Sequence, residues 1–204
     1  MYELFELFER KKQDDAKNGK LEKKEKSVFT FIADNAFVRK LDAGTSVSIN
    51  GVCLTVLEKP TEDFFLVEIM PETETKTNIQ KLEINDMVNL ELPATLDTFL
   101  SGHIVQGHVD ATTKIIAIKE DGNSYIFTLS LPEQIAKYIV EKGSITLNGI
   151  SLTVITLDQK SFTVGIIPHT WKNTMLHTAR ENDFINIEVD VLAKYVEKLL
   201  KKNS

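Results

Sequence analysis

The chain has few of the residues that cross-link small folds. Its 204 residues include one cysteine, Cys53, which excludes an internal disulfide and a cysteine-rich zinc site. No apolar run approaches the ~20 residues that a bilayer-spanning helix needs. The opening residues MYELFELFER lack the basic, then apolar, then small-residue order of a secretory signal. We therefore expect a cytoplasmic protein with no membrane segment.

Acidic residues outnumber basic ones, 30 to 24. The formal net charge is −6, whereas a nucleic-acid partner favours a basic face, so we expect no nucleic-acid partner. With 42% hydrophobic residues in this length, the chain can bury one sizeable core or two small ones.

A long sequence pattern is present twice. Ser46–Val56 reads SVSINGVCLTV, and Ser144–Val154 reads SITLNGISLTV. Each copy then reaches a Pro-x-Thr-x-x-x-Thr stretch, at 71–77 and 168–174, and closes on an Asn-Leu-Glu or Asn-Ile-Glu triplet. A repeat of this length matches a whole small domain rather than a solenoid unit. We predict two similar domains, at 1–97 and 98–189, followed by a segment at 190–204.

Apolar residues alternate within each copy around an Asn-Gly dipeptide, Asn50-Gly51 or Asn148-Gly149. This dipeptide supplies the positive φ angles of a two-residue type I′ turn, so each copy predicts a β-hairpin. Many short strands punctuated by turns indicate a small antiparallel barrel in each half. The further predicted strands are Ser27–Ala33, Phe64–Met70, Val88–Leu92, Ser124–Ser130, Ser161–Ile167 and Ile185–Val189.

Two segments depart from this pattern. Lys11–Lys26 holds seven lysines against four acids, and we interpret it as a solvated hairpin loop. In Val191–Lys202 the apolar residues recur at helical spacing, which predicts an amphipathic helix. This helix could pack on its own barrel or contact another subunit, and the sequence leaves both open.

Strand alternation gives the hairpins a polar outer face. If Val52, Leu54 and Val56 face the core, Cys53 and Thr55 point away. The same parity turns Ser151 and Thr153 outward in the second copy. Such residues are most often simply solvated, but duplication beside the Pro-x-Thr stretch favours a ligand surface. Nothing in the sequence indicates a partnered base for the Cys53 thiol.

Between the copies lies the segment Ser101–Asp110, in which two glycines are each followed by a histidine. Glycine permits close backbone approach, and imidazole can donate or accept a proton near neutral pH. In a strand, His103 and His108 would project to opposite faces, which disfavours a metal site between them.

Together these motifs resemble the riboflavin synthase family, whose members are built from two lumazine-binding domains. The similarity extends from about Phe29 to Asp190 and depends on several motifs in the correct order. The motifs are Asn50-Gly-Val-Cys-Leu-Thr-Val56, Met70-Pro-Glu-Thr73, Gly102-His-Ile-Val-Gln-Gly-His-Val-Asp110, Lys142-Gly-Ser144, Asn148-Gly-Ile-Ser-Leu-Thr-Val154, Ile167-Pro-His-Thr170 and Ile185-Asn-Ile-Glu-Val-Asp190.

The resemblance implies an all-β fold of two similar six-stranded antiparallel Greek-key barrels with a C-terminal α-helix that joins subunits. It implies dismutation of two 6,7-dimethyl-8-ribityllumazine molecules to riboflavin and 5-amino-6-(D-ribitylamino)uracil, with no cofactor and no metal. The pocket would lie between the N-terminal barrel of one subunit and the C-terminal barrel of its neighbour in a homotrimer. An association with lumazine synthase is left open.

The resemblance also implies site residues. Cys53, His108, Ser151 and Asp190 would handle protons or stabilise charge. The lumazine-binding residues would be Leu4, Phe5, Glu6, Cys53, Leu54, Thr55, Glu68, Ile69, Met70, Pro71, Glu72, Thr73, Gly107, His108, Val109 and Lys142 together with Ser151, Leu152, Thr153, Ile167, Pro168, His169, Thr170, Trp171 and Lys172.

The chain departs from the family at its start, where Met1-Tyr-Glu-Leu-Phe-Glu6 replaces the usual Met-Phe-Thr-Gly-Ile-Val, and at His169, where many relatives carry Glu. Non-catalytic lumazine or flavin carriers share the double barrel and are the main alternative. A purely structural oligomerising domain is a third. Carriers tend to lose the second histidine and the hairpin Cys or Ser, which this chain retains, so we favour the enzyme.

Overall fold

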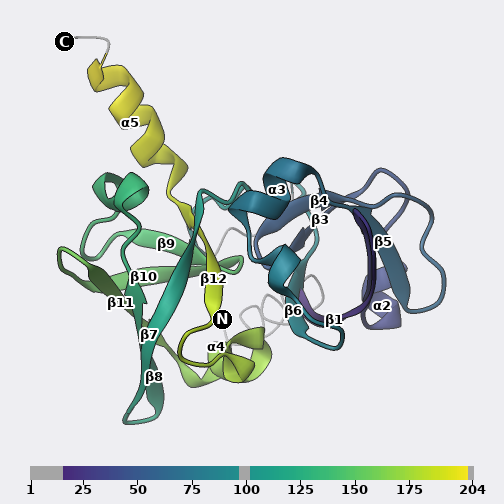
Figure 1. Cartoon of the computed structure of the whole chain (residues 1–204), viewed down its shortest axis with the longest axis horizontal. Coiled ribbons are helices and arrows are strands. Elements are labelled where there is room, and N and C mark those ends of the chain that lie inside the picture. Colours follow the sequence, from purple (N-terminus) through teal and green to yellow (C-terminus); the bar gives the residue numbers. More distant parts are fainter. Residues whose placement is uncertain (1–15, 97–101, 202–204) are drawn as a thin grey trace, which may run out of the picture.

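A computed structural model describes residues 16–96 and 102–201. They form two antiparallel units that lie side by side, purple to blue and teal to yellow in Figure 1. The first unit comprises β1 (Ala16–Glu25), β2 (Val28–Ile32), β3 (Ser46–Ile49), β4 (Val52–Thr55), β5 (Phe64–Glu68) and β6 (Met87–Glu91). The second comprises β7 (Ala111–Asp121), β8 (Ser124–Ser130), β9 (Ser144–Leu147), β10 (Ile150–Leu157), β11 (Ser161–Ile166) and β12 (Phe184–Val189).

Short helices connect the strands. They are α2 (Asn35–Val38), α3 (Pro71–Lys76) and α4 (Pro168–Asn173), with 3-10 turns at η1 (Ile79–Lys81), η2 (Glu133–Tyr138) and η3 (Met175–Thr178), and the longer α5 (Val191–Lys201) follows β12. Both α3 and α4 begin at the proline of the repeated Pro-x-Thr stretch, because proline lacks an N–H and is tolerated in the first turn of a helix.

Both units have the same strand order. The first runs β4-β3-β6-β1-β2-β5, and the second is a closed barrel in the order β10-β11-β8-β7-β12-β9. In the first unit the edge strands β4 and β5 approach through an isolated bridge between Val56 and Val67, so that barrel is nearly closed. The predicted fold class, two six-stranded antiparallel barrels with a C-terminal helix, is confirmed.

We predicted a solvated hairpin loop at Lys11–Lys26. This prediction is wrong for the described part of the segment, where Ala16–Glu25 form strand β1. Leu21 is fully buried, and Gly19 lies so close to β2 that an added Cβ would be 2.7 Å from the carbonyl oxygen of Ile32. The many lysines favoured a loop. A strand can nevertheless be mostly polar when neighbouring strands supply most of the buried side chains.

Each barrel encloses a separate hydrophobic core. Phe29, Phe31 and Phe65 lie in the first, and Phe127 and Phe162 in the second; all five are essentially inaccessible to solvent. A buried aromatic or aliphatic side chain contributes about 1.5–3 kcal/mol, so each barrel has its own source of stability.

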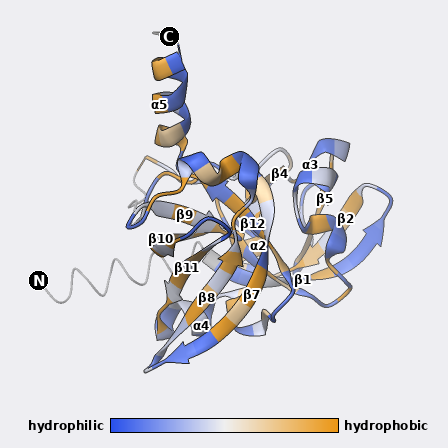
Figure 2. Ribbon diagram, turned by 60° about the vertical axis from the view of Figure 1, so that its left-hand side comes forward, coloured by the Kyte–Doolittle hydropathy of each residue, from blue (hydrophilic) through white to orange (hydrophobic). Residues whose placement is uncertain are grey.

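Helix α5 extends from the end of β12 beyond the strands of the second barrel (Figure 1) and carries apolar and polar residues (Figure 2). Near its end, Glu197 accepts hydrogen bonds from Lys137 and Tyr138. The Lys137 ammonium is the main cause that lowers the pKa of Glu197 to about 2. The helix prediction is confirmed as far as Lys201. Within residues 16–96 and 102–201, no helix combines the length and apolar character needed to cross a membrane.

The two Asn-Gly turns meet between the barrels. An added Cβ on Gly51 would lie 2.5 Å from the backbone nitrogen of Gly149, so the turns touch backbone to backbone. Asn50 and Asn148 are fully buried and have positive φ angles of 47° and 45°. This φ range is the one that asparagine and glycine adopt most readily.

Four asparagines link the turns in a symmetric network. Within each barrel, the Oδ1 atoms of Asn50 and Asn148 accept the backbone N–H groups of Asn89 and Asn186, both at 2.8 Å. Across the interface, Asn186 Nδ2 donates to the carbonyl of Asn50, and Asn89 Nδ2 donates to that of Asn148, again at 2.8 Å. The exchange satisfies backbone groups that burial would otherwise leave unpaired.

We expect Asn148→Ala to lower the free energy of unfolding by about 2–4 kcal/mol. The change leaves the buried Asn186 N–H without its side-chain acceptor and puts alanine at positive φ. Asn85→Ala is the control, because Asn85 also has positive φ (74°) but is exposed. Denaturant titration measures both, and equal losses would contradict a role for the network.

Candidate functional site

The outer face of β4 carries the residues that strand parity singled out. Cys53 and Thr55 are exposed, whereas Leu54 is 6% exposed. Ser151 and Thr153 are exposed at the equivalent places on β10. Leu152, which parity predicts to be buried, is only partly buried and packs against the edge of the second core. The two barrels therefore present matching polar pairs, as the sequence predicts.

The segment between the barrels touches both polar faces. An added Cβ on Gly102 would lie 2.5 Å from Ser151 Oγ, and one on Gly107 would lie 2.7 Å from Cys53 Cβ. Gly107 has a φ of 77°, and its carbonyl accepts the Cys53 N–H at 2.9 Å. Both glycines thus permit the close approach that the sequence suggested. Residues 102–110, which we call the linker, are a loop and not the strand assumed in weighing a metal site.

His103 lies between two hydroxyl groups of the second barrel. Its Nδ1 is 2.8 Å from Ser151 Oγ, and its Nε2 is 3.0 Å from Thr146 Oγ1. Thr146 is 1% exposed. In the tautomer that donates from Nε2 to Thr146, Nδ1 accepts a hydrogen bond from the Ser151 hydroxyl, which makes the serine oxygen more basic. Sequence reasoning did not assign His103 or Thr146 to the site, although the repeated Gly-His pair was a signal for His103.

Glu188 fixes the other end of the linker. This carboxylate is 3% exposed and accepts the backbone N–H groups of Gln106, Gly107 and His108, at 2.8, 3.0 and 3.1 Å. The side chain of Val109 then packs against the first core. In the sequence, Glu188 stands out only as part of a repeated triplet, and this contact was not predicted.

Two aspartates organise the junction with α5. Asp110 accepts the Val189 N–H at 2.9 Å and pairs with Lys194 at 2.7 Å. Asp190, which we predicted to be catalytic, accepts the Leu192 N–H at 2.9 Å and caps the first turn of α5. This contact is with the α5 backbone, and the catalytic role of Asp190 stays a prediction.

The predicted binding residues around α3 and α4 divide into exposed and packed side chains. Met70 and Ile167 precede these helices and are 66% and 57% exposed. Ile69 is buried in the first core, and Trp171 stacks on Tyr125 with ring centroids 3.8 Å apart. The remaining members, which are exposed or half-buried, are Glu68, Pro71, Glu72, Thr73, Pro168, His169, Thr170 and Lys172.

The other predicted residues lie apart from these groups or outside the described range. Lys142, which we expected among the lumazine-binding residues of the first barrel, belongs to the second barrel, where its ammonium lies 3.4 Å from the carbonyl of Ile155. Leu4, Phe5 and Glu6 lie outside the described residues.

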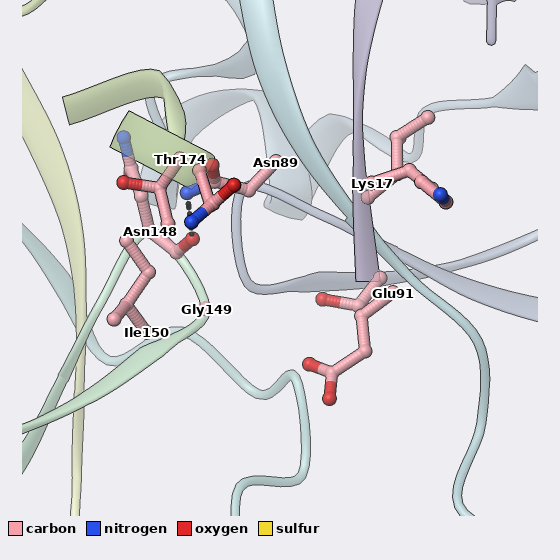
Figure 3. Close-up of a pocket in the computed structure, with 10 residues that line it drawn as sticks. Lys17, Asn89, Glu91, Asn148, Gly149, Ile150 and Thr174 are labelled. Atoms are coloured by element: carbon pink, nitrogen blue, oxygen red, sulfur yellow. Dashed lines mark hydrogen bonds between the residues drawn. The ribbon is translucent and has the colours of Figure 1, made fainter. Parts of the chain in front are cut away.

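Two cavities lie away from the polar pairs. One of about 70 Å³ lies between the barrels and is lined by Lys17, Glu91 and Asn148 (Figure 3), where the Asn89–Asn148 hydrogen bond crosses the interface. The other, of about 430 Å³, lies between α5 and the second barrel and includes Tyr138 and Asp190. Neither is lined by Cys53 or Ser151.

The chain is similar in sequence to known proteins. A family model described as "Lumazine binding domain" matches residues 10–93 and again 106–190. The riboflavin synthase of Mycobacterium bovis is 44% identical over 78% of this chain and 80% of its own length. That of Actinobacillus pleuropneumoniae is 39% identical over 85% and 81%.

Solved structures show the same fold at lower identity. The crystal structure of LumP complexed with 6,7-dimethyl-8-(1'-D-ribityl) lumazine has a TM-score of 0.76 and 19% identity, covering 87% of this chain and 98% of that one. LumP complexed with riboflavin has a TM-score of 0.77 and 18% identity, with coverage of 87% and 97%.

We expect Cys53→Ser to leave the free energy of unfolding within about 0.5 kcal/mol of the unmodified protein, because the side chain is exposed. Leu54→Ala should lower it by about 2–5 kcal/mol, because it truncates a core side chain. Denaturant titration of both variants checks the parity of β4. A reversed order would place Cys53 in the core and remove it from the site.

Proposed function

The chain belongs to the lumazine binding domain family, and from this we propose that it is a riboflavin synthase. It transfers a four-carbon unit between two 6,7-dimethyl-8-ribityllumazine molecules, giving riboflavin and 5-amino-6-(D-ribitylamino)uracil. The observation that carries the proposal is the duplicated polar pair, Cys53 and Thr55 on one barrel and Ser151 and Thr153 on the other. Two alike faces suit two identical substrates.

Positioning supplies much of the catalysis in this proposal. The reaction begins with loss of a proton from the acidic C7 methyl group of one lumazine, so the protein mainly orients two flat heterocycles and supports proton transfer. Thr55 and Thr153 would hold the ring systems by hydrogen bonds. No cofactor or metal takes part in the proposed reaction.

The second barrel holds a candidate proton-handling group. His103 lies within hydrogen-bonding distance of Ser151, so Ser151 can pass a proton to the imidazole while its oxygen faces a bound lumazine. Cys53 occupies the equivalent place on the first barrel without such a contact in the described structure. This difference gives the two substrates different roles, one as donor and one as acceptor.

A non-catalytic lumazine carrier is the second candidate function. The likeness to LumP supports the fold alone, because the identity is 18–19%. The chain keeps Cys53, Ser151 and His108, and its relatives of much higher identity are enzymes. The enzyme is therefore the better supported function.

We test the function by incubating the purified protein with the lumazine and following flavin absorbance. Formation of riboflavin and the uracil in equal amounts supports the synthase. Tight lumazine binding without turnover would support the carrier, and absence of binding would leave a structural role.

The proposal includes a cytoplasmic homotrimer. The apolar stripe of α5 is open, with Leu192, Tyr195 and Leu199 each more than 60% exposed, as expected of a helix that packs against other subunits. The site would then lie between neighbouring subunits, and Lys142 would reach the Cys53 group of the next subunit. Association with lumazine synthase stays a prediction of the resemblance, and co-sedimentation tests it.

We expect Leu199→Glu to convert the trimer to monomers and to remove most of the activity, because a charge enters the apolar stripe. Lys198→Glu changes a polar position of the same helix and is the control. Sedimentation velocity with parallel turnover measurements checks both. A fully active monomer would contradict a site shared between subunits.

We expect His108→Gln to lower turnover moderately and to leave the pH profile largely intact, because an amide can still donate a hydrogen bond. An obligate proton-transfer role would instead cost about 10²-fold or more and remove one limb of the profile. Turnover measured from pH 5 to 9 separates these outcomes. Unmodified turnover and lumazine affinity would exclude His108 from the site.

A further inference from the structure

A carboxylate of the second barrel controls the backbone beside Cys53 of the first. Glu188 lies on β12 and is almost fully buried, so its charge is costly unless it is met by donors. Three consecutive backbone N–H groups, those of Gln106, Gly107 and His108, meet it. The carboxylate therefore fixes three successive peptide groups of the linker relative to β12.

The fixed peptide groups lead directly to the candidate site. Gly107 donates its N–H to Glu188 and accepts the Cys53 N–H through its carbonyl, at 2.9 Å. Gly107 has positive φ and leaves no space for a side chain against Cys53. A change in the Glu188 contact thus moves the partner of the Cys53 backbone and the Cα of His108 together.

We propose that Glu188 is a positioning residue for the Cys53 site, acting through the linker and without touching substrate. The inference rests on the proposed function for its catalytic consequence, but not for its structural one. Both oxygens of the carboxylate are used as acceptors, Oε1 for Gln106 and Oε2 for the other two. A glutamine has one acceptor oxygen, and its NH₂ group would face an N–H donor.

The first experiment compares Glu188→Gln with Glu181→Gln in the full chain. Glu181 is the matched control, because it is exposed on the same barrel and accepts one backbone N–H, from Ile118 at 3.3 Å. We expect residue-resolved hydrogen exchange at the Cys53 amide to become at least about tenfold faster in Glu188→Gln. Core amides such as Val164 should be unchanged, and Glu181→Gln should match the unmodified protein.

The second experiment measures steady-state kinetics with the lumazine. We expect Glu188→Gln to lower kcat/KM by about 10- to 100-fold, because small displacements of positioning groups lower the reaction rate strongly. The pH profile should keep its shape, since Glu188 transfers no proton to substrate. A lost limb of the profile would overturn the positioning role and make Glu188 a proton-transfer residue.

Gly107→Ala provides an independent route, with Gly44→Ala as its control. Both glycines have positive φ, but an added Cβ meets Cys53 at Gly107 and nothing within 4 Å at Gly44. We expect Gly107→Ala to reproduce faster exchange at Cys53 and slower turnover, and Gly44→Ala to do neither. If Glu188→Gln does not fold, Gly107→Ala and the exchange at Cys53 decide the question.

Unchanged exchange at Cys53 in folded Glu188→Gln would overturn the inference, as would a uniform rise across both barrels, which indicates general destabilisation. Absence of turnover in the unmodified protein would refute the synthase but leave the exchange result interpretable. The two proposals therefore fail separately.

Discussion

The backbone contact between the two Asn-Gly turns is the constraint on which the rest of the molecule depends. Each turn ends one barrel's hairpin, and the glycines approach so closely that no side chain fits. The four asparagines then exchange hydrogen bonds across the contact. Because β4 and β10 begin immediately after these turns, the contact also sets the relation between Cys53 and Ser151. Their relative positions follow from the turns.

Duplication gives the two barrels the same architecture, but the linker makes them unequal. Its first part places Gly102 and His103 against Ser151, and its later part places Gly107 against Cys53. One face therefore gains an imidazole and the other gains a fixed backbone turn. Such a difference suits a reaction in which two identical substrates play different roles.

Much of the fold could be predicted because its signals are local. Alternating apolar residues around Asn50-Gly51 and Asn148-Gly149 identified both hairpins and the outward direction of Cys53 and Ser151. Strand β1 was missed because its lysines outnumber its apolar residues, although Leu21 fills the core. Strand β7 was not predicted from the sequence either. Glu188 could not be recognised as a site residue, because its partners are backbone groups distant in sequence. Thr146 could not be recognised either, because its partner is His103, which is also distant in sequence.

Because β4 is an edge strand, the repeated sequence unit alone does not supply all the contacts of the first barrel. The Cys53 N–H of this strand is paired with a carbonyl from the linker that precedes the second barrel. The side chain of Val109 likewise covers part of the first core. The first barrel thus takes one backbone partner and part of its packing from residues that lie beyond the start of the second repeat. Each half has its own core and its own copy of the motif, but a boundary drawn before the linker would remove these contacts from the first barrel.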